Sequence, residues 1–81
     1  RLWNQPNPAA DRTTVRYTGA AFPAGSRLTV HDALGAIVLD VPFNSRSKEL
    51  DLQSWAPGLY SYAVQSAEGS SASARLLVVR P

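Results

Sequence analysis

The sequence predicts an all-β fold, a seven-stranded immunoglobulin-like antiparallel β-sandwich. No window of the 81-residue chain shows apolar residues at helical spacing, whereas short alternating or continuous apolar runs recur along its whole length. Seven such runs follow one another at intervals of about 10 residues, and Gly, Pro and Ser gather between them. Short strands at regular spacing, separated by turn residues, are typical of two packed sheets.

Four strands are expected in the first half of the chain. A short extended piece covers residues 2–4, and residues 13–18 combine β-branched threonines with alternating apolar positions. Residues 28–31 and 36–41 alternate in the same way, and Gly35 between them can take the positive φ that closes a hairpin. The residues expected to face the core are Val15, Tyr17, Leu28, Val30, Ile37, Leu39 and Val41.

Three strands are expected in the second half. Residues 43–47 are mostly polar and are predicted to form a loop, after which residues 48–52 resume the alternation. A corner at residues 53–58 leads into residues 59–65, which have the clearest strand pattern of the chain. Residues 74–80 form the last strand after a Gly/Ser-rich turn. The inward residues expected here are Leu50, Leu52, Tyr60, Tyr62 and Val64.

Composition limits the classes of function. A chain of 81 residues is expected to form a single domain, residues 1–81, because a second core would lack material. It has no cysteine and one histidine, which excludes disulfide scaffolds and zinc knuckles. The eight Lys and Arg residues are scattered among six acidic residues, so no nucleic-acid partner is expected. No apolar run approaches the roughly 18 residues of a transmembrane segment.

The polar residues contain no recognisable arrangement for catalysis or metal binding. His31 stands beside Asp32, but no nucleophile motif accompanies them, and the alternation places His31 on the solvent face of its strand. Asp40, Glu49 and Asp51 lack the close spacing of a calcium loop. We therefore expect no enzymatic activity, no cofactor and no metal site.

Four aromatic residues allow two interpretations. Trp3, Trp55, Tyr60 and Tyr62 could form a platform on which a sugar or a base stacks. Alternatively, the last three are core and corner residues, with a tyrosine hydroxyl bound to a loop carbonyl, as occurs in sandwich corners. The second interpretation is favoured for those three residues. It makes Gly58 and Tyr60 the residues that fix the corner before the next strand.

The last expected strand has two different faces. If every second residue from Ala74 to Val78 faces the core, Leu77 and Val79 lie on the outer face beside Arg75 and Arg80. An apolar outer row on an edge strand favours pairing with a partner. The alternative, that other parts of the domain cover both faces, stays open at this point. The alternate residues expected to face the core are Ala74, Leu76 and Val78.

Four segments of the chain carry short motifs in a fixed order. A Pro-Asn-Pro segment at residues 6–8 precedes a threonine-rich strand, and an Asp-x-x-Gly hairpin ends at Gly35. A Leu-Asp-Leu segment then precedes the Gly-x-Tyr corner at residues 58–60, and a basic, apolar segment occupies residues 74–80. In this order and spacing, essentially the whole chain resembles the type IX secretion system C-terminal sorting domain (type A), which is immunoglobulin-like.

The resemblance implies a function. It implies the C-terminal module of a larger secreted protein, with the cargo on its N-terminal side, and the absence of methionine fits a piece of a longer chain. Type IX outer-membrane components would recognise this secretion and sorting signal, and a sortase would remove it. The cargo would then pass through the periplasm to the outer-membrane surface or extracellular space of a Gram-negative bacterium. The alternative is an immunoglobulin-like adhesion or carbohydrate-binding module of a bacterial surface protein.

Two groups of residues are singled out by these expectations. One group has structural roles, with the Pro-Asn-Pro segment as a stiff, extended piece that sets the angle of the first long strand. The other group recognises the partner, which would add a strand to the exposed edge of the last strand. The structural residues are Pro6, Asn7, Pro8, Gly35, Gly58 and Tyr60, and the recognition residues are Arg75, Leu77, Val79 and Arg80.

Overall fold

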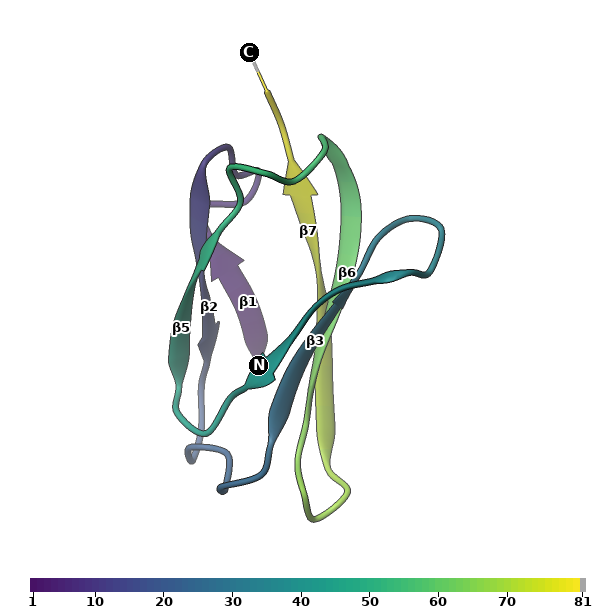
Figure 1. The fold of residues 1–81 in the computed structure, drawn as a ribbon. Coiled ribbons are helices and arrows are strands. Elements are labelled where there is room, and N and C mark those ends of the chain that lie inside the picture. Colours follow the sequence, from purple (N-terminus) through teal and green to yellow (C-terminus); the bar gives the residue numbers. More distant parts are fainter. Residues whose placement is uncertain (81) are drawn as a thin grey trace.

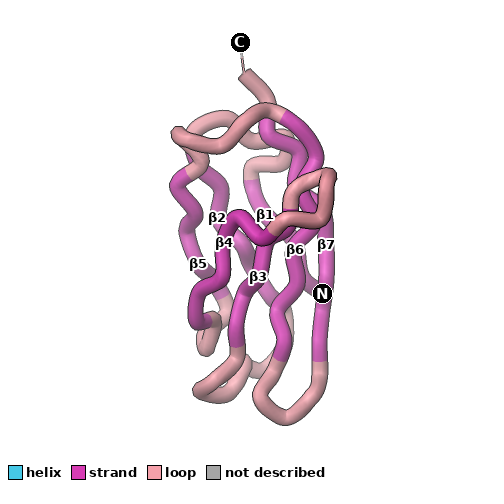
Figure 2. The backbone as a smooth tube through the Cα atoms, turned by 45° about the vertical axis from the view of Figure 1, so that its right-hand side comes forward, coloured by secondary structure: helices cyan, strands magenta, loops and turns pink. Residues whose placement is uncertain are grey.

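Seven strands and no helix make up the described part of the chain, which confirms the all-β prediction (Figures 1 and 2). This computed structural model describes residues 1–80, and Pro81, the chain's last residue, lies outside the described part. Strand β7 begins earlier than expected and ends at Val78 rather than at Arg80. The strands are β1 (Leu2–Gln5), β2 (Arg12–Tyr17), β3 (Arg27–His31), β4 (Ile37–Pro42), β5 (Ser47–Asp51), β6 (Gly58–Gln65) and β7 (Ser71–Val78).

The strands form two antiparallel sheets that pack face to face as an immunoglobulin-like sandwich. One sheet has the order β1-β2-β5, and the other has the order β4-β3-β6-β7. Figure 1 shows the first sheet on the left and the second sheet on the right. Strands β1 and β7 come from opposite ends of the sequence but lie next to each other. Strands β4 and β7 are the two edges of the four-stranded sheet.

The core lies between the sheets and follows the predicted alternation. Every second residue is buried along β3 and along most of β6, as Leu28 and Val30 show on β3 and Tyr60, Tyr62 and Val64 on β6. Side chains alternate between the two faces of a strand, so one face of each sheet fills the space between the layers. The other buried apolar residues are Leu2, Ala9, Val15, Phe22, Phe43, Leu50, Leu52, Leu76 and Val78.

Two connecting segments add aromatic side chains to the core, which the alternation did not predict. The rings of Phe22 and Phe43 lie 6.0 Å apart, and Phe22 lies 4.5 Å from the ring of Tyr17. The backbone N–H of Phe43 donates to the carbonyl oxygen of Ser26 at 2.9 Å. The loop predicted at residues 43–47 is therefore tied to the core by its first residue.

The prediction that Ile37 faces the core is wrong, because its side chain is 61% exposed. Val30 pairs with Leu39, but the next residue, His31, pairs with Ile37. Val38 is thus an extra residue on β4, which makes a β-bulge. A shift of one residue moves a side chain to the opposite face of the sheet, so Ile37 lies on the outer face with His31.

Candidate functional site

Strand β7 presents one apolar face to the core and another to the outside. Leu76 and Val78 are buried, whereas Leu77 and the following Val79 are 38% and 40% exposed. This arrangement confirms the predicted parity of the last strand. It also shows that the rest of the domain does not cover the outer row.

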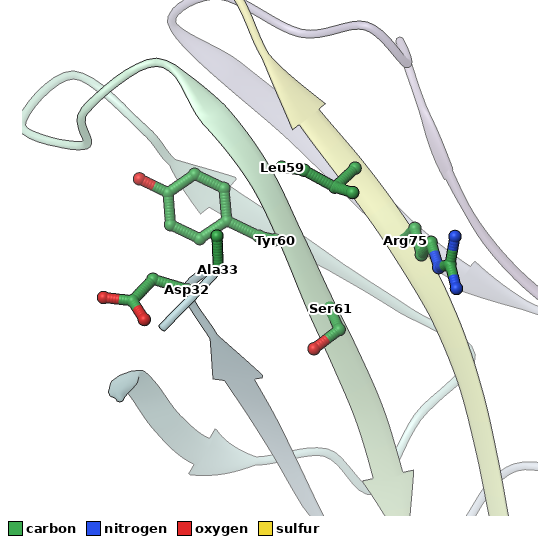
Figure 3. Close-up of a pocket in the computed structure, with 6 residues that line it drawn as sticks. All are labelled: Asp32, Ala33, Leu59, Tyr60, Ser61 and Arg75. Atoms are coloured by element: carbon green, nitrogen blue, oxygen red, sulfur yellow. The ribbon is translucent and has the colours of Figure 1, made fainter. Parts of the chain in front are cut away.

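Leu59 on β6 extends this outer row across two strands. It is the register partner of Leu77, and its side chain is 48% exposed. Figure 3 shows Leu59 directed toward β7. We call Leu59, Leu77 and Val79 the outer patch. The sequence analysis missed Leu59, although the inward orientation of Tyr60 implies that its neighbour faces outward.

Arg75 lies on the same face of β7, two residues before Leu77. Its register partner on β6 is the small residue Ser61, and Arg75 is exposed. Within residues 1–80, the only ion pair joins Arg27 and Asp40, at 2.7 Å. The positive charge of Arg75 is therefore free to meet an acidic group outside the domain.

A shallow pocket of about 310 Å³ lies where the end of β3 meets the start of β6 (Figure 3). Its side chains do not converge on one point, because the carboxylate of Asp32 and the guanidinium of Arg75 point in different directions. The pocket thus adds an uneven surface beside the outer patch. Its lining residues are Asp32, Ala33, Leu59, Tyr60, Ser61 and Arg75.

The carboxylate of Asp32 is used by the hairpin between β3 and β4. Its Oδ1 accepts hydrogen bonds from the backbone N–H groups of Leu34, at 2.9 Å, and Ala36, at 3.0 Å. Gly35 has a φ of 87°, as its predicted role in the turn requires, and its N–H donates to the Asp32 carbonyl oxygen at 3.0 Å. Asp32 therefore stabilises the turn of this hairpin.

The edge of β7 is covered in its C-terminal half, so the expected open edge is wrong there. The Nδ2 of Asn7 donates to the carbonyl oxygen of Arg75 at 3.0 Å, and its Oδ1 accepts from the N–H of Leu77 at 3.1 Å. The Ala9 N–H donates to the carbonyl oxygen of Leu77 at 2.9 Å, and the Ala9 carbonyl accepts from the N–H of Val79 at 2.8 Å. The chain's own N-terminal segment thus occupies the place of a partner strand.

A polar network joins the Pro-Asn-Pro segment to both sheets. The buried Asn4 donates through Nδ2 to Thr13 Oγ1 and to the Pro6 carbonyl oxygen, both at 3.1 Å, and the Thr13 hydroxyl donates to the same carbonyl at 2.8 Å. The hydroxyl of Tyr62 donates to Asn4 Oδ1 at 2.9 Å, and Asn7 Nδ2 reaches the same oxygen at 3.3 Å. Side chains from β1 and β2 therefore hold Pro6 and Asn7, and Tyr62 on β6 holds Asn4 in turn. These contacts bend the chain at residues 6–8, so the predicted extended shape of this segment is wrong.

The expectation that Arg80 lies on the outer face is wrong. Arg80 lies two residues after the buried Val78, so its side chain points to the same side of the chain as that of Val78. It turns toward the loops at this end of the sandwich. Nη2 donates to the carbonyl oxygens of Leu52, at 2.6 Å, and Trp55, at 2.9 Å, and Nη1 donates to that of Ala10. Arg80 stabilises these loops, and its charge is not presented beside the outer patch.

The corner before β6 is built as the sequence predicted. The Tyr60 hydroxyl donates to the Ala56 carbonyl oxygen at 2.6 Å, and the ring of Tyr60 packs 5.0 Å from that of Trp55. Gly58 has a φ of 151°, which residues with a Cβ rarely adopt. Tyr60 is buried, as is Tyr62, so these aromatic residues do not form a stacking platform.

The remaining acidic and histidine side chains do not gather. No group of three or more His, Cys, Asp or Glu side chains suited to a metal ion occurs within the described part of the chain. His31 is half-buried, and Glu49 and Asp51 are exposed on β5. Trp3 is half-buried on β1, where the Arg1 guanidinium lies 5.5 Å from its ring.

The profile of the secretion system C-terminal sorting domain family matches residues 5–79. The chain belongs to this family. It is a C-terminal sorting signal of the type IX secretion system, as its sequence motifs implied. The sorting domain serves secretion to the cell surface or the extracellular space. No curated protein matches the chain.

Two solved structures share the fold of the sorting domain. PorZ, described as an essential bacterial surface component of the type IX secretion system of Porphyromonas gingivalis, matches with a TM-score of 0.79 and 20% identity, over 98% of this chain and 11% of PorZ. CopC from Methylosinus trichosporium OB3b matches with a TM-score of 0.56 and 19% identity, over 96% of this chain and 91% of CopC. The sorting domain therefore spans a small part of PorZ, and the likeness is one of fold.

Within residues 1–80, the sorting domain has no helix of the length and apolarity needed to cross a membrane.

Burial raises the pKa of Tyr62 to about 12. The folded-state pKa exceeds the ordinary value of 10.0, so the contribution of Tyr62 to stability is complete below pH 10 and is lost as the pH rises through about 12. Between about pH 9 and 12, we expect the parent domain to lose about 2 kcal/mol more unfolding free energy than Tyr62→Phe. Urea titrations at both pH values measure this difference. Parallel losses in the two proteins would contradict the prediction.

Proposed function

We propose that the export machinery recognises the sorting domain through the outer patch and the adjacent Arg75. The observation that supports this proposal is the gathering of three exposed aliphatic side chains, one on β6 and two at the end of the edge strand β7. Exposed apolar clusters on small domains mark contacts with other proteins. Because Asn7 and Ala9 occupy the neighbouring backbone edge, the partner contacts the side chains of the outer face rather than adding a strand there.

Arg75 gives this surface its charge. A guanidinium forms paired hydrogen bonds with a carboxylate or a phosphate, which adds directional specificity to apolar contact. The partner surface therefore combines an apolar depression with an acidic group placed to meet Arg75. Arg80 takes no part in this contact, because its guanidinium is bound to four carbonyl oxygens of the domain.

The proposed route places the cargo on the N-terminal side of the domain. The cargo passes through the periplasm, outer-membrane components of the type IX system bind the sorting domain, and a sortase removes it as the cargo is attached at the surface. Membership of the sorting-domain family supports this route. The alternative of carbohydrate binding has no comparable support, because Tyr60 and Tyr62 are buried.

Leu59→Ser should reduce surface delivery of an attached cargo by about tenfold, because it removes a central apolar contact of the outer patch. Leu34→Ser is the matched control: Leu34 is 95% exposed at the tip of the β3–β4 hairpin, outside the outer patch. Surface protease accessibility of a reporter fused before the domain measures delivery, and thermal melts report folding. Parental delivery of the Leu59 variant, or an equal loss in the Leu34 variant, would count against the proposal.

We further propose that the sorting domain acts without catalytic or metal chemistry. This proposal is supported by the use of the Asp32 carboxylate in a turn and of the Asp40 carboxylate in its ion pair with Arg27. Adding divalent metal ions, or a chelator, should leave the thermal midpoint of the isolated domain unchanged. Stabilisation by several degrees with one metal ion per chain, reversed by the chelator, would disprove it, as would turnover of a hydrolase substrate.

A further inference from the structure

We propose that residues 7–9 act as a latch on the last strand. While the latch is seated, the edge of β7 along residues 75–79 is closed to any further strand. When the latch leaves, the C-terminal half of β7 opens as a unit. This inference is independent of which surface the export machinery recognises.

The Asn7 carboxamide takes the place of a peptide group on this edge. Its donor binds the carbonyl oxygen of Arg75 and its acceptor binds the N–H of Leu77, while Ala9 supplies the next donor and acceptor for Leu77 and Val79. Because bonding directions alternate along a strand, the residues between these positions bond to β6. Four successive outward groups of β7 are therefore satisfied by a segment that is not a regular strand.

The latch covers the half of β7 where pairing would be most favourable. Ser71 and Ser73 pair with β6, and within residues 1–80 no other backbone group bonds to their outer edge. The covered half carries Leu77 and Val79, whose exposed aliphatic side chains suit strand pairing better than serine does. A free edge with such side chains is prone to pair with another chain. The latch prevents this pairing at residues 75–79.

The latch is also linked to the N-terminal strands. Asn4 binds the carbonyl oxygen of Pro6 and contacts the Asn7 side chain, while Ala10, just after the latch, accepts a hydrogen bond from Arg80. Displacing residues 6–10 therefore breaks the hydrogen bonds of Asn7 and Ala9 to β7 and, at the same time, the hydrogen bond of Arg80 to Ala10. The state of the segment between β1 and β2 thus controls access to the edge of β7.

Amide hydrogen exchange of the full chain tests the latch. In Asn7→Ala, the N–H groups of Leu77 and Val79 should exchange at least about tenfold faster than in the parent, because both become open to water. The N–H groups of Leu28 and Val30, on the central strand β3, should change less than about threefold. These internal references separate local opening from general loss of stability.

Two further variants complete the test. Asn7→Asp keeps an acceptor for the N–H of Leu77 but loses the donor to Arg75, so its Leu77 exchange rate should lie between those of the parent and Asn7→Ala. Asn44→Ala changes an exposed loop asparagine and should match the parent. Unchanged Leu77 exchange in Asn7→Ala would overturn the latch, and faster exchange of Leu77 without Val79 would overturn opening as a unit. Equal acceleration at Leu28 and Leu77 would show general destabilisation and would also overturn it.

Discussion

Leu77→Ser combined with Val79→Ser should abolish surface delivery of an attached cargo while the sorting domain stays folded. Both side chains face outward, so neither substitution opens a cavity in the core. Substitutions at such surface positions usually change stability by no more than about 0.5 kcal/mol each. Recognition, by contrast, loses two of the three aliphatic side chains of the outer patch. Fractionation of cells carrying a cargo–domain fusion measures delivery, and circular dichroism measures folding.

Leu76→Ser combined with Val78→Ser is the matched control for this prediction. These neighbours are buried, so serine at both positions should unfold the domain. Loss of delivery would then accompany loss of the cooperative melt, whereas the outward variant should lose delivery alone. Truncation before residue 77 is less informative, because it also removes the Val79 and Arg80 hydrogen bonds. If the folded outward variant reached the surface at the parental level, the outer patch would not be the recognition surface.

Tyr60→Ala should lower the free energy of unfolding by roughly 3–5 kcal/mol, the range seen for truncation of buried aromatic residues. The ring fills the corner against Trp55, and the hydroxyl binds the Ala56 carbonyl oxygen. Both contributions are lost together in the alanine variant. Urea titrations of the parent and the variant measure the difference.

Tyr60→Phe separates the two contributions. It keeps the ring against Trp55 and removes only the hydrogen bond to Ala56, so the expected cost is about 1 kcal/mol. Equal stability of Tyr60→Ala and the parent would contradict the buried position of this side chain. A cost in Tyr60→Phe as large as in Tyr60→Ala would show that the hydroxyl, rather than ring packing, holds the corner.

The sequence alone determined the fold class, the approximate strand limits and the orientation of most side chains. The alternation of apolar residues is a local property, and it follows directly from the two faces of a strand. It therefore predicted that Leu28 and Tyr62 are buried. It also predicted that Leu76 faces the core and its neighbour Leu77 faces outward. The corner hydrogen bond of Tyr60 was also predictable, because it joins residues close together in the chain.

Only the tertiary structure decided what lies beside each strand. The bulge at Val38 turns Ile37 outward, because register depends on the partner strand and not on the strand's own pattern. The register of β6 against β7 joins Leu59 to the outer patch. Asn7 closes the edge of the last strand, and its hydrogen bonds span most of the chain's length. Such contacts depend on how the two sheets bring distant segments together, and no local periodicity records that arrangement.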